Sequence, residues 1–116
     1  DAEWVVMRSH VRTGVELLHR YPETRDIAPI VAQHHERPDG TGYPNGTRTA
    51  GICIEAKIIS VTDALTAMLA DRPYRPARTH DDARNRLLAG RGTQFDPTIV
   101  DTLLAILSED TQRRAA

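Results

Sequence analysis

Cysteine is almost absent from this sequence, with Cys53 as its single example. One thiol excludes an internal disulfide and a thiolate zinc site, and it fits a reducing compartment, so we expect a cytoplasmic location. An excess of one charge is also missing, because fifteen basic residues stand against sixteen acidic ones. No overall field therefore attracts a nucleic acid polymer or an anionic membrane, and any recognition of phosphate must be local.

Long apolar runs are missing as well. No stretch approaches the roughly 20 apolar residues that a membrane-spanning helix needs, and no basic, apolar and small-residue series marks a signal peptide. The length of 116 residues predicts one domain, residues 1–116. Because the chain opens with Asp1 and shows helical patterning within a few residues, we expect a further segment upstream.

Helical periodicity runs through most of the chain, without repeats or paired strands. Apolar spacing and capping residues predict helices at residues 2–21, 26–35, 55–70, 81–89 and 97–110. Asp26 and Asp96 are the expected N-caps of the second and last helices, and the chain is expected to fray from residue 111. Residues 55–70 are apolar around much of the helix, which is typical of a central buried one. The predicted fold class is all-α.

Residues 37–51 interrupt this pattern with closely spaced glycines and prolines, which neither a helix nor a strand tolerates. A loop of this length in a small domain is usually either functional or disordered. We favour a functional loop because of the residues on either side of it.

Five of these flanking and nearby residues could bind a metal or a phosphate. His34 and His35 diverge by about 100 degrees on a regular helix, but the adjoining loop could bring both rings to one centre. The alternative is two solvated histidines at a helix end. Asp63, inside an apolar helix, needs a metal, a salt bridge or hydrogen-bond donors. Arg72 and Arg75 suit phosphate oxygens, or else nearby carboxylates.

His10 lies within the first helix, with Gly14 one turn later, which leaves room beside the imidazole for a metal or for another helix. Three histidines and a carboxylate form a set suited to iron, manganese or zinc. His19 and His80 have no comparable neighbours, so we expect them to be ordinary surface residues. Together with the arginines, the set indicates a phosphodiester as ligand.

The segment HHERPDGTGYPNG at residues 34–46 closely resembles the signature of HD-GYP domains, the bacterial signalling module that hydrolyses cyclic di-GMP. Two further segments resemble neighbouring blocks of this family: AKIISVTDALTAMLADRPYRPA at residues 56–77 and SHVRTGVELL at residues 9–18. The resemblance covers roughly residues 7–106. It implies a helical bundle of about five helices, similar to the HD superfamily, with one long Gly/Pro-rich loop.

The resemblance also implies roles for particular residues. It assigns metal ligation to His10, His34, His35 and Asp63, substrate binding to Arg72, Arg75 and Tyr43, and loop shaping to Asp39, Gly40, Gly42 and Pro44. The implied cofactor is a divalent metal, iron or manganese, and the implied substrate is cyclic di-GMP.

Two departures from the family pattern bear on activity. Thr66 stands where relatives carry a second aspartate, and the histidine–aspartate pair expected upstream of His10 is absent, together with its following lysine. No catalytic residue is therefore assignable, and we expect an incomplete metal site and an inactive fragment, because the bridging carboxylate holds the geometry for metal-assisted hydrolysis.

Three functions remain open. The first is a part of a cyclic di-GMP phosphodiesterase. The second is a degenerate, non-catalytic module that either binds the dinucleotide or docks on a diguanylate cyclase or regulatory domain. A phosphohydrolase of the wider HD type, acting on ordinary nucleotides, is the third, and the GYP loop argues against it. Apolar surface left uncovered by missing helices usually finds a partner, so a homodimer is expected.

Overall fold

The computed structural model describes residues 2–116 and confirms the all-helical class. Its five α-helices are α1 (Ala2–His19), α2 (Ala28–Gln33), α3 (Ile54–Leu69), α4 (His80–Ala89) and α5 (Pro97–Ala115), and two short 3-10 helices lie at Pro22–Ile27 and Thr49–Gly51. In the described part of the chain, β-structure is limited to two isolated bridges. No helix within residues 2–116 has the length and apolar character needed to cross a bilayer.

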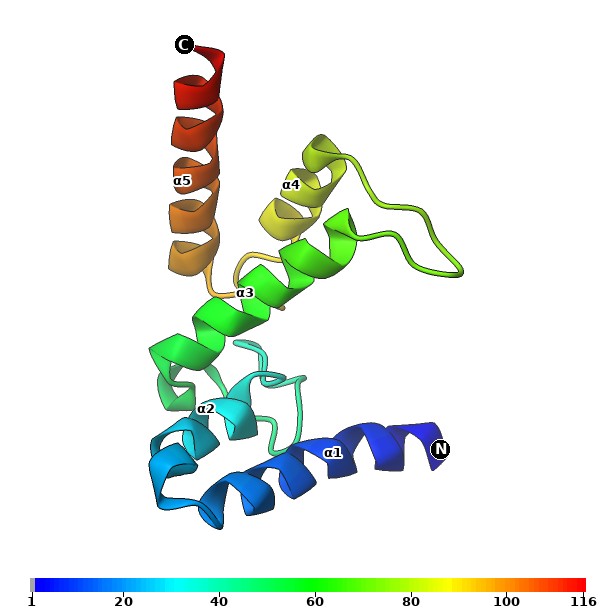
Figure 1. Cartoon of the computed structure of the whole chain (residues 1–116), viewed down its shortest axis with the longest axis vertical. Helices are drawn as coiled ribbons and strands as arrows, with labels where there is room; N and C mark the ends of the chain where they lie inside the picture. Colours follow the sequence, from blue (N-terminus) through cyan, green and yellow to red (C-terminus); the bar gives the residue numbers. More distant parts are fainter. Residues whose placement is uncertain (1) are drawn as a thin grey trace.

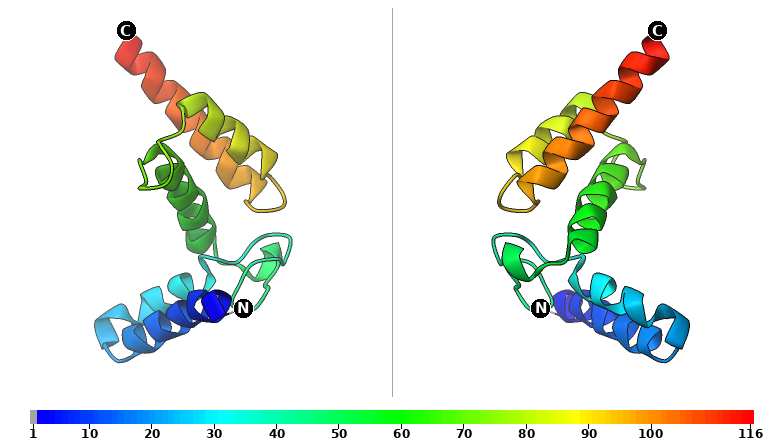
Figure 2. Two further views of the ribbon diagram at one scale, coloured as in Figure 1. Left: turned by 90° about the vertical axis from the view of Figure 1, so that its right-hand side faces the viewer. Right: turned by 90° about the vertical axis from the view of Figure 1, so that its left-hand side faces the viewer.

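The helices form two packed groups joined by α3 (Figure 1). One group pairs α1 with α2, and the other packs α4 and α5 against α3. The molecule is elongated, with extents of 49 × 31 × 27 Å, and Figure 2 shows the two groups at opposite ends of α3. The main core lies in the second group and contains Val61, Leu87, Phe95 and Val100.

Two sequence predictions about the ends of the helices are wrong, and one is confirmed. Asp26 is not an N-cap, because Pro22–Ile27 forms a 3-10 helix that leads directly into α2. The end of the chain does not fray at residue 111, since α5 continues to Ala115 with an ion pair between Arg114 and Asp110 at 3.0 Å. Asp96 does cap α5, because its carboxylate accepts a hydrogen bond from the Ile99 amide at 3.1 Å.

The prediction of a buried central helix also needs correction. α3 is central, but its only fully buried residues are Ala56 and Val61. Ile54, Ile58 and Ile59 are 60%, 43% and 40% exposed, because the two packed groups cover only part of the helix. The homodimer, in which a second copy of the chain would cover this surface, stays a prediction.

Candidate metal centre

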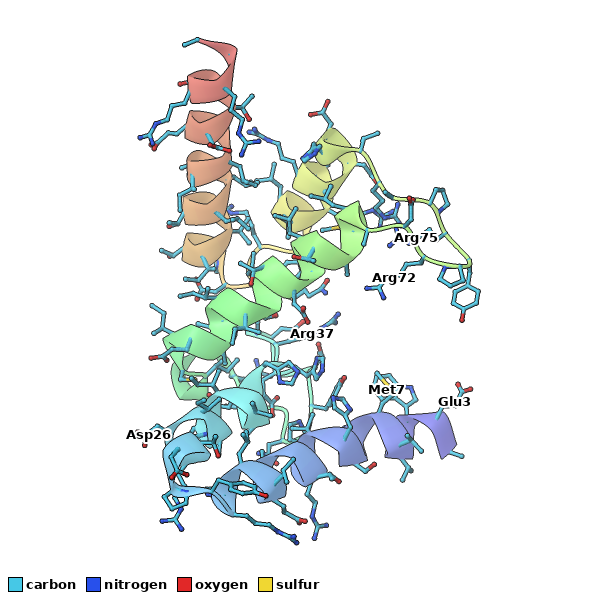
Figure 3. All side chains as sticks on the ribbon, in the orientation of Figure 1. Glu3, Met7, Asp26, Arg37, Arg72 and Arg75 are labelled. Atoms are coloured by element: carbon cyan, nitrogen blue, oxygen red, sulfur yellow. The ribbon has the colours of Figure 1, made fainter. Side chains whose placement is uncertain are left out.

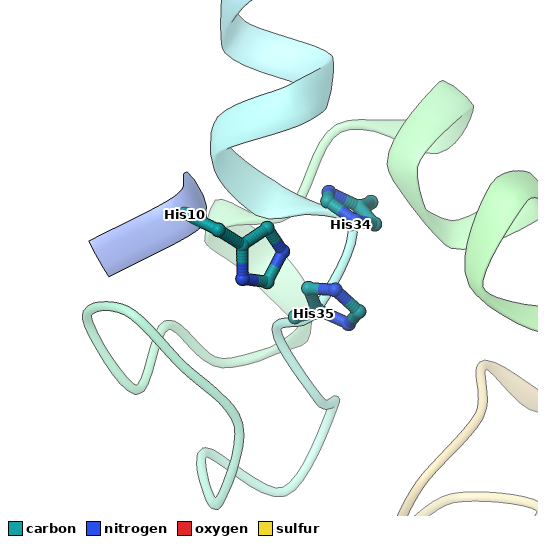
Figure 4. Close-up of side chains that lie close together, drawn as sticks. All are labelled: His10, His34 and His35. Atoms are coloured by element: carbon teal, nitrogen blue, oxygen red, sulfur yellow. The ribbon is translucent and has the colours of Figure 1, made fainter. Parts of the chain in front are cut away.

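Three histidines converge where α1 meets the end of α2 (Figure 4). His10 comes from the middle of α1, and His34 and His35 follow the last residue of α2. Each ring offers a nitrogen, and these nitrogens all lie within 4.8 Å of one another. The distance suits a single metal ion, so the cluster could hold one.

The end of α2 explains how two adjacent histidines face one centre. The helix stops at Gln33, and the amide of Glu36 donates to the Gln33 carbonyl at 2.9 Å in a turn. The rings of His34 and His35 consequently lie with centroids 3.9 Å apart instead of diverging. Of the two alternatives for this pair, the geometry favours convergence over separate solvation.

The tautomer of His34 is fixed by its surroundings. Its Nδ1 donates to the carbonyl of Val31 at 2.7 Å, which leaves Nε2 as an acceptor directed elsewhere. A histidine ligand normally donates its other ring nitrogen in this way, and that bond orients the ring for metal binding. Gly14, by contrast, makes room for α2 and not for a metal, because its α-carbon faces Val31.

Electrostatics keep His35 neutral. Its pKa is lowered to about 4, first by burial and then by the neighbouring His34 and His10, while Asp63 acts in the opposite direction. A neutral imidazole is the form that binds a metal, because a protonated ring has no free lone pair. The three residues therefore fit a divalent transition metal in their geometry, and His35 fits it in its charge state as well.

Tyr43 connects the histidines to the Gly/Pro-rich loop. Its ring stacks on His35 with centroids 4.8 Å apart, and its amide donates to the His35 carbonyl at 3.2 Å. Trp4 of α1 also contacts the Tyr43 ring edge-on, with centroids 5.8 Å apart. Burial raises the pKa of the Tyr43 hydroxyl, so it stays protonated at neutral pH. Trp4 was not among the predicted site residues, because nothing in the sequence relates it to Tyr43.

A buried carboxylate organises the same loop. Glu36 is only 3% exposed, and its two oxygens accept hydrogen bonds from the amides of Asn45 at 2.7 Å and Thr47 at 2.9 Å. Glu36 was not among the predicted site residues either. A signal was present, because a loop rich in glycine and proline leaves backbone amides without partners, and a charged residue at its start can satisfy them.

The four predicted loop-shaping residues all occupy constrained positions. Asp39 accepts hydrogen bonds from the amide and hydroxyl of Thr41 at 2.9 and 2.6 Å, and the peptide bond before Pro44 is cis. Gly40 has a φ of +80°, which favours glycine. Gly42 is buried, and a β-carbon there would lie 2.4 Å from the His35 carbonyl oxygen.

Asp63 lies near the cluster without joining it. It lines the same hollow of about 260 Å³ as His34, His35 and Tyr43, and its charge acts on His35. The side chain is exposed, however, and the group of converging ligand atoms in residues 2–116 contains the three histidines alone. Its role as a ligand stays a prediction.

The two arginines assigned to substrate occupy different surroundings. Arg72 is exposed and points away from α4 (Figure 3). Arg75 donates to the carbonyls of Ala67 at 3.0 Å and Pro76 at 3.2 Å, so its guanidinium also holds the loop after α3. Their contact with a phosphate stays a prediction.

The remaining histidines are exposed, as expected of His19 and His80. The only adjacent histidine–aspartate pair in the sequence, His80–Asp81, begins α4 and lines a hollow between α4 and α5. This pair therefore lies on a different part of the molecule from the three converging histidines.

The family model described as "HD domain" matches residues 1–99. The chain belongs to this family, and it is related within it to the HD-GYP cyclic di-GMP phosphodiesterases. It is 46% identical over 107 residues to the cyclic di-GMP phosphodiesterase response regulator RpfG of Xanthomonas campestris, which covers 90% of this chain and 28% of that protein.

Two other comparisons agree. Over 116 residues the chain is 36% identical to 3'3'-cGAMP-specific phosphodiesterase 2 of Vibrio cholerae, covering 98% of this chain and 22% of that protein. The crystal structure of a Vibrio cholerae cyclic GMP-AMP phosphodiesterase, V-cGAP3, shares the fold with a TM-score of 0.73 at 15% identity, over 87% of this chain and 23% of that one. The chain thus spans about a quarter of the length of these relatives.

Replacing His10 by alanine is expected to weaken binding of a divalent cation by about 10-fold or more, since even residues that only support a ligand change metal affinity on this scale. Calorimetric titration with Mn²⁺ measures this affinity. Elemental analysis of the purified, unaltered chain should separately find less than one metal ion per chain. His19→Ala, on the same helix and also exposed but outside the cluster, is the control. Equal affinities of the two variants would contradict the cluster.

Gly42→Ala is expected to lower the free energy of unfolding by about 1–3 kcal/mol, because the added methyl group meets the backbone around His35. Gly14→Ala is the matched control. Its β-carbon would lie 3.5 Å from Val31, and alanine in a helix gains up to about 1 kcal/mol over glycine. Urea denaturation measures both, and equal effects would show that the loop does not pack tightly on His35.

Proposed function

We propose that this chain is the metal-binding and substrate-binding part of a phosphodiesterase that hydrolyses a cyclic dinucleotide, with cyclic di-GMP as the substrate. The observation that carries the proposal is the convergence of His10, His34 and His35, with the ring of Tyr43 stacked on His35. A metal site opening onto a hollow lined by aromatic and cationic side chains suits a ligand made of phosphates and bases.

In this proposal His10, His34 and His35 hold iron or manganese, both of which accept imidazole ligands. A divalent ion held there supplies Lewis acidity toward a phosphoryl oxygen and toward water. The hydrogen bond from His34 to the Val31 carbonyl orients its ring, and burial keeps His35 neutral. The orientation of the His34 ring and the neutral state of His35 are thus both in place before a substrate binds.

The hollow beside the histidines supplies the other contacts. Arg37 lines it together with Tyr43 and Asp63. The guanidinium of Arg37 can neutralise phosphate charge, and the ring of Tyr43 offers a surface on which a base can stack. Arg72 is exposed and is not engaged in a side-chain ion pair among the described residues, so it is free to contact phosphate.

The substrate rests on the relatives as well as on the site. The relative that is 46% identical is named for cyclic di-GMP, and a relative that is 36% identical is named for 3'3'-cGAMP. Both ligands are cyclic dinucleotides with two phosphodiesters, and they differ in one base. We favour cyclic di-GMP because of the higher identity.

A second candidate function is binding without turnover, either of the dinucleotide or of a diguanylate cyclase. It is favoured by the composition of the cluster, which within residues 2–116 has three histidines and no carboxylate. A carboxylate shared by two metals positions the activated water in metal-assisted hydrolysis. A site without that carboxylate is therefore better suited to binding the dinucleotide than to hydrolysing it.

We expect the 116-residue chain to bind cyclic di-GMP weakly and to hydrolyse it negligibly when loaded with Mn²⁺ or Fe²⁺. Arg72→Ala should weaken binding about 10-fold, the scale of one charge-assisted hydrogen bond. Arg84→Ala, an exposed arginine of α4 that lines a different hollow, should leave it unchanged. Linear product and equilibrium binding are measured on the same preparation.

Two results would count against these statements. Rapid turnover by the chain alone would show that the three histidines suffice for catalysis. Binding that is insensitive to Arg72→Ala would remove that residue from the substrate site.

A further inference from the structure

Three arginines gather around a second hollow beside the one that contains the histidines. Arg75, Arg78 and Arg86 line this hollow, whose volume is about 270 Å³. Arg75 and Arg78 come from the loop after α3, and Arg86 comes from α4. None of the functional assignments above includes Arg78 or Arg86.

The two hollows are neighbours along α3. Ala64, Ala67, Gln94 and Phe95 line both of them. Asp63 belongs to the hollow of the histidines, and Met68 belongs to that of the arginines. From Asp63 to Ala67 the helix rises about 6 Å, so the two hollows adjoin along one stretch of α3. A ligand that extends along this stretch would reach both of them.

Positive charge is in excess in the hollow of the arginines. Arg78 and Arg86 share a single carboxylate, that of Asp82, at 2.9 and 3.4 Å. The side-chain bonds of Arg75 go to backbone carbonyls and to no acid. Three guanidinium groups thus face one carboxylate, and the two groups that share it keep donors for another anion.

Stabilisation of α4 is the alternative explanation for these contacts. Both ion pairs have i,i+4 spacing, and such pairs contribute only about 0.3–0.5 kcal/mol when exposed. The helix already has a side-chain cap, since the Thr79 hydroxyl accepts from the Asp82 amide at 3.1 Å. Neither these weak ion pairs nor the cap of α4 therefore explains why three arginines line one hollow.

We propose that Arg78 and Arg86, together with Arg75, form a second phosphate-binding subsite. This inference rests on the proposed function. A cyclic dinucleotide carries two phosphates separated by a sugar, so a ligand with one phosphate at the histidines presents the other a short distance away. The guanidinium forks match the oxygens of that second phosphate.

The test measures the affinity of the Mn²⁺-loaded chain for cyclic di-GMP in variants of α4. Arg86→Gln is expected to weaken binding about 10-fold. Asp82→Asn is expected to strengthen it, because the carboxylate that competes with phosphate is removed. Arg84→Gln, which removes the same charge from another side of α4, is the control and should have no effect. All variants should keep the Mn²⁺ affinity of the unaltered chain.

The outcomes separate this inference from the proposed function. Failure of the unaltered chain to bind cyclic di-GMP would overturn both. Normal binding by Arg86→Gln, or weaker binding by Asp82→Asn, would overturn the subsite alone. If Arg86→Gln loses helical circular dichroism, Asp82→Asn still decides the question, because its expected effect has the opposite sign to that of damage to the fold.

Discussion

The buried carboxylate of Glu36 is the interaction on which the candidate metal centre depends. A buried charge is costly unless it is fully hydrogen-bonded, and here two loop amides satisfy it at 2.7 and 2.9 Å. These bonds draw the loop back over the end of α2. Gly42 then approaches the His35 carbonyl, and the ring of Tyr43 stacks on His35. The position of the loop therefore follows from a residue outside the histidine cluster.

The second constraint is the path of α3 between the two packed groups. Its face with Ser60, Asp63 and Ala67 lines the hollow of the histidines, and the same face continues toward the arginines. Val61 anchors the helix in the main core. Because α3 fixes both hollows, the separation of the metal centre from the arginine cluster is set by one rigid element.

The sequence predicted the helices well because their periodicity is local information. It also predicted that His34 and His35 lie at a helix end, where a glycine- and proline-rich loop begins. It did not predict the 3-10 helix before α2, whose form depends on how Pro22–Ile27 packs between α1 and α2. The partial exposure of α3 was missed too, because periodicity reports which residues are apolar and not what covers them.

The contributions of Trp4 and Glu36 depend on tertiary structure. Trp4 is distant in sequence from Tyr43 and meets it only because α1 lies beside the loop. Glu36 is adjacent to the histidines, but its function requires amides nine and eleven residues later. For Asp63 the sequence indicated a polar partner inside an apolar helix, whereas the structure exposes that residue at the rim of the hollow. The spacing of residues along the sequence does not by itself reveal which of these three side chains contacts the site.

The central claim is that the side chains of His10, His34 and His35 bind one metal ion. X-ray absorption spectroscopy at the manganese edge, on the chain loaded with Mn²⁺, tests it most directly because imidazole rings have a distinct multiple-scattering signature. We expect a coordination shell that contains three imidazole rings, and the loss of one ring in His10→Ala. A shell made only of oxygen ligands, or one unchanged by that substitution, would contradict it.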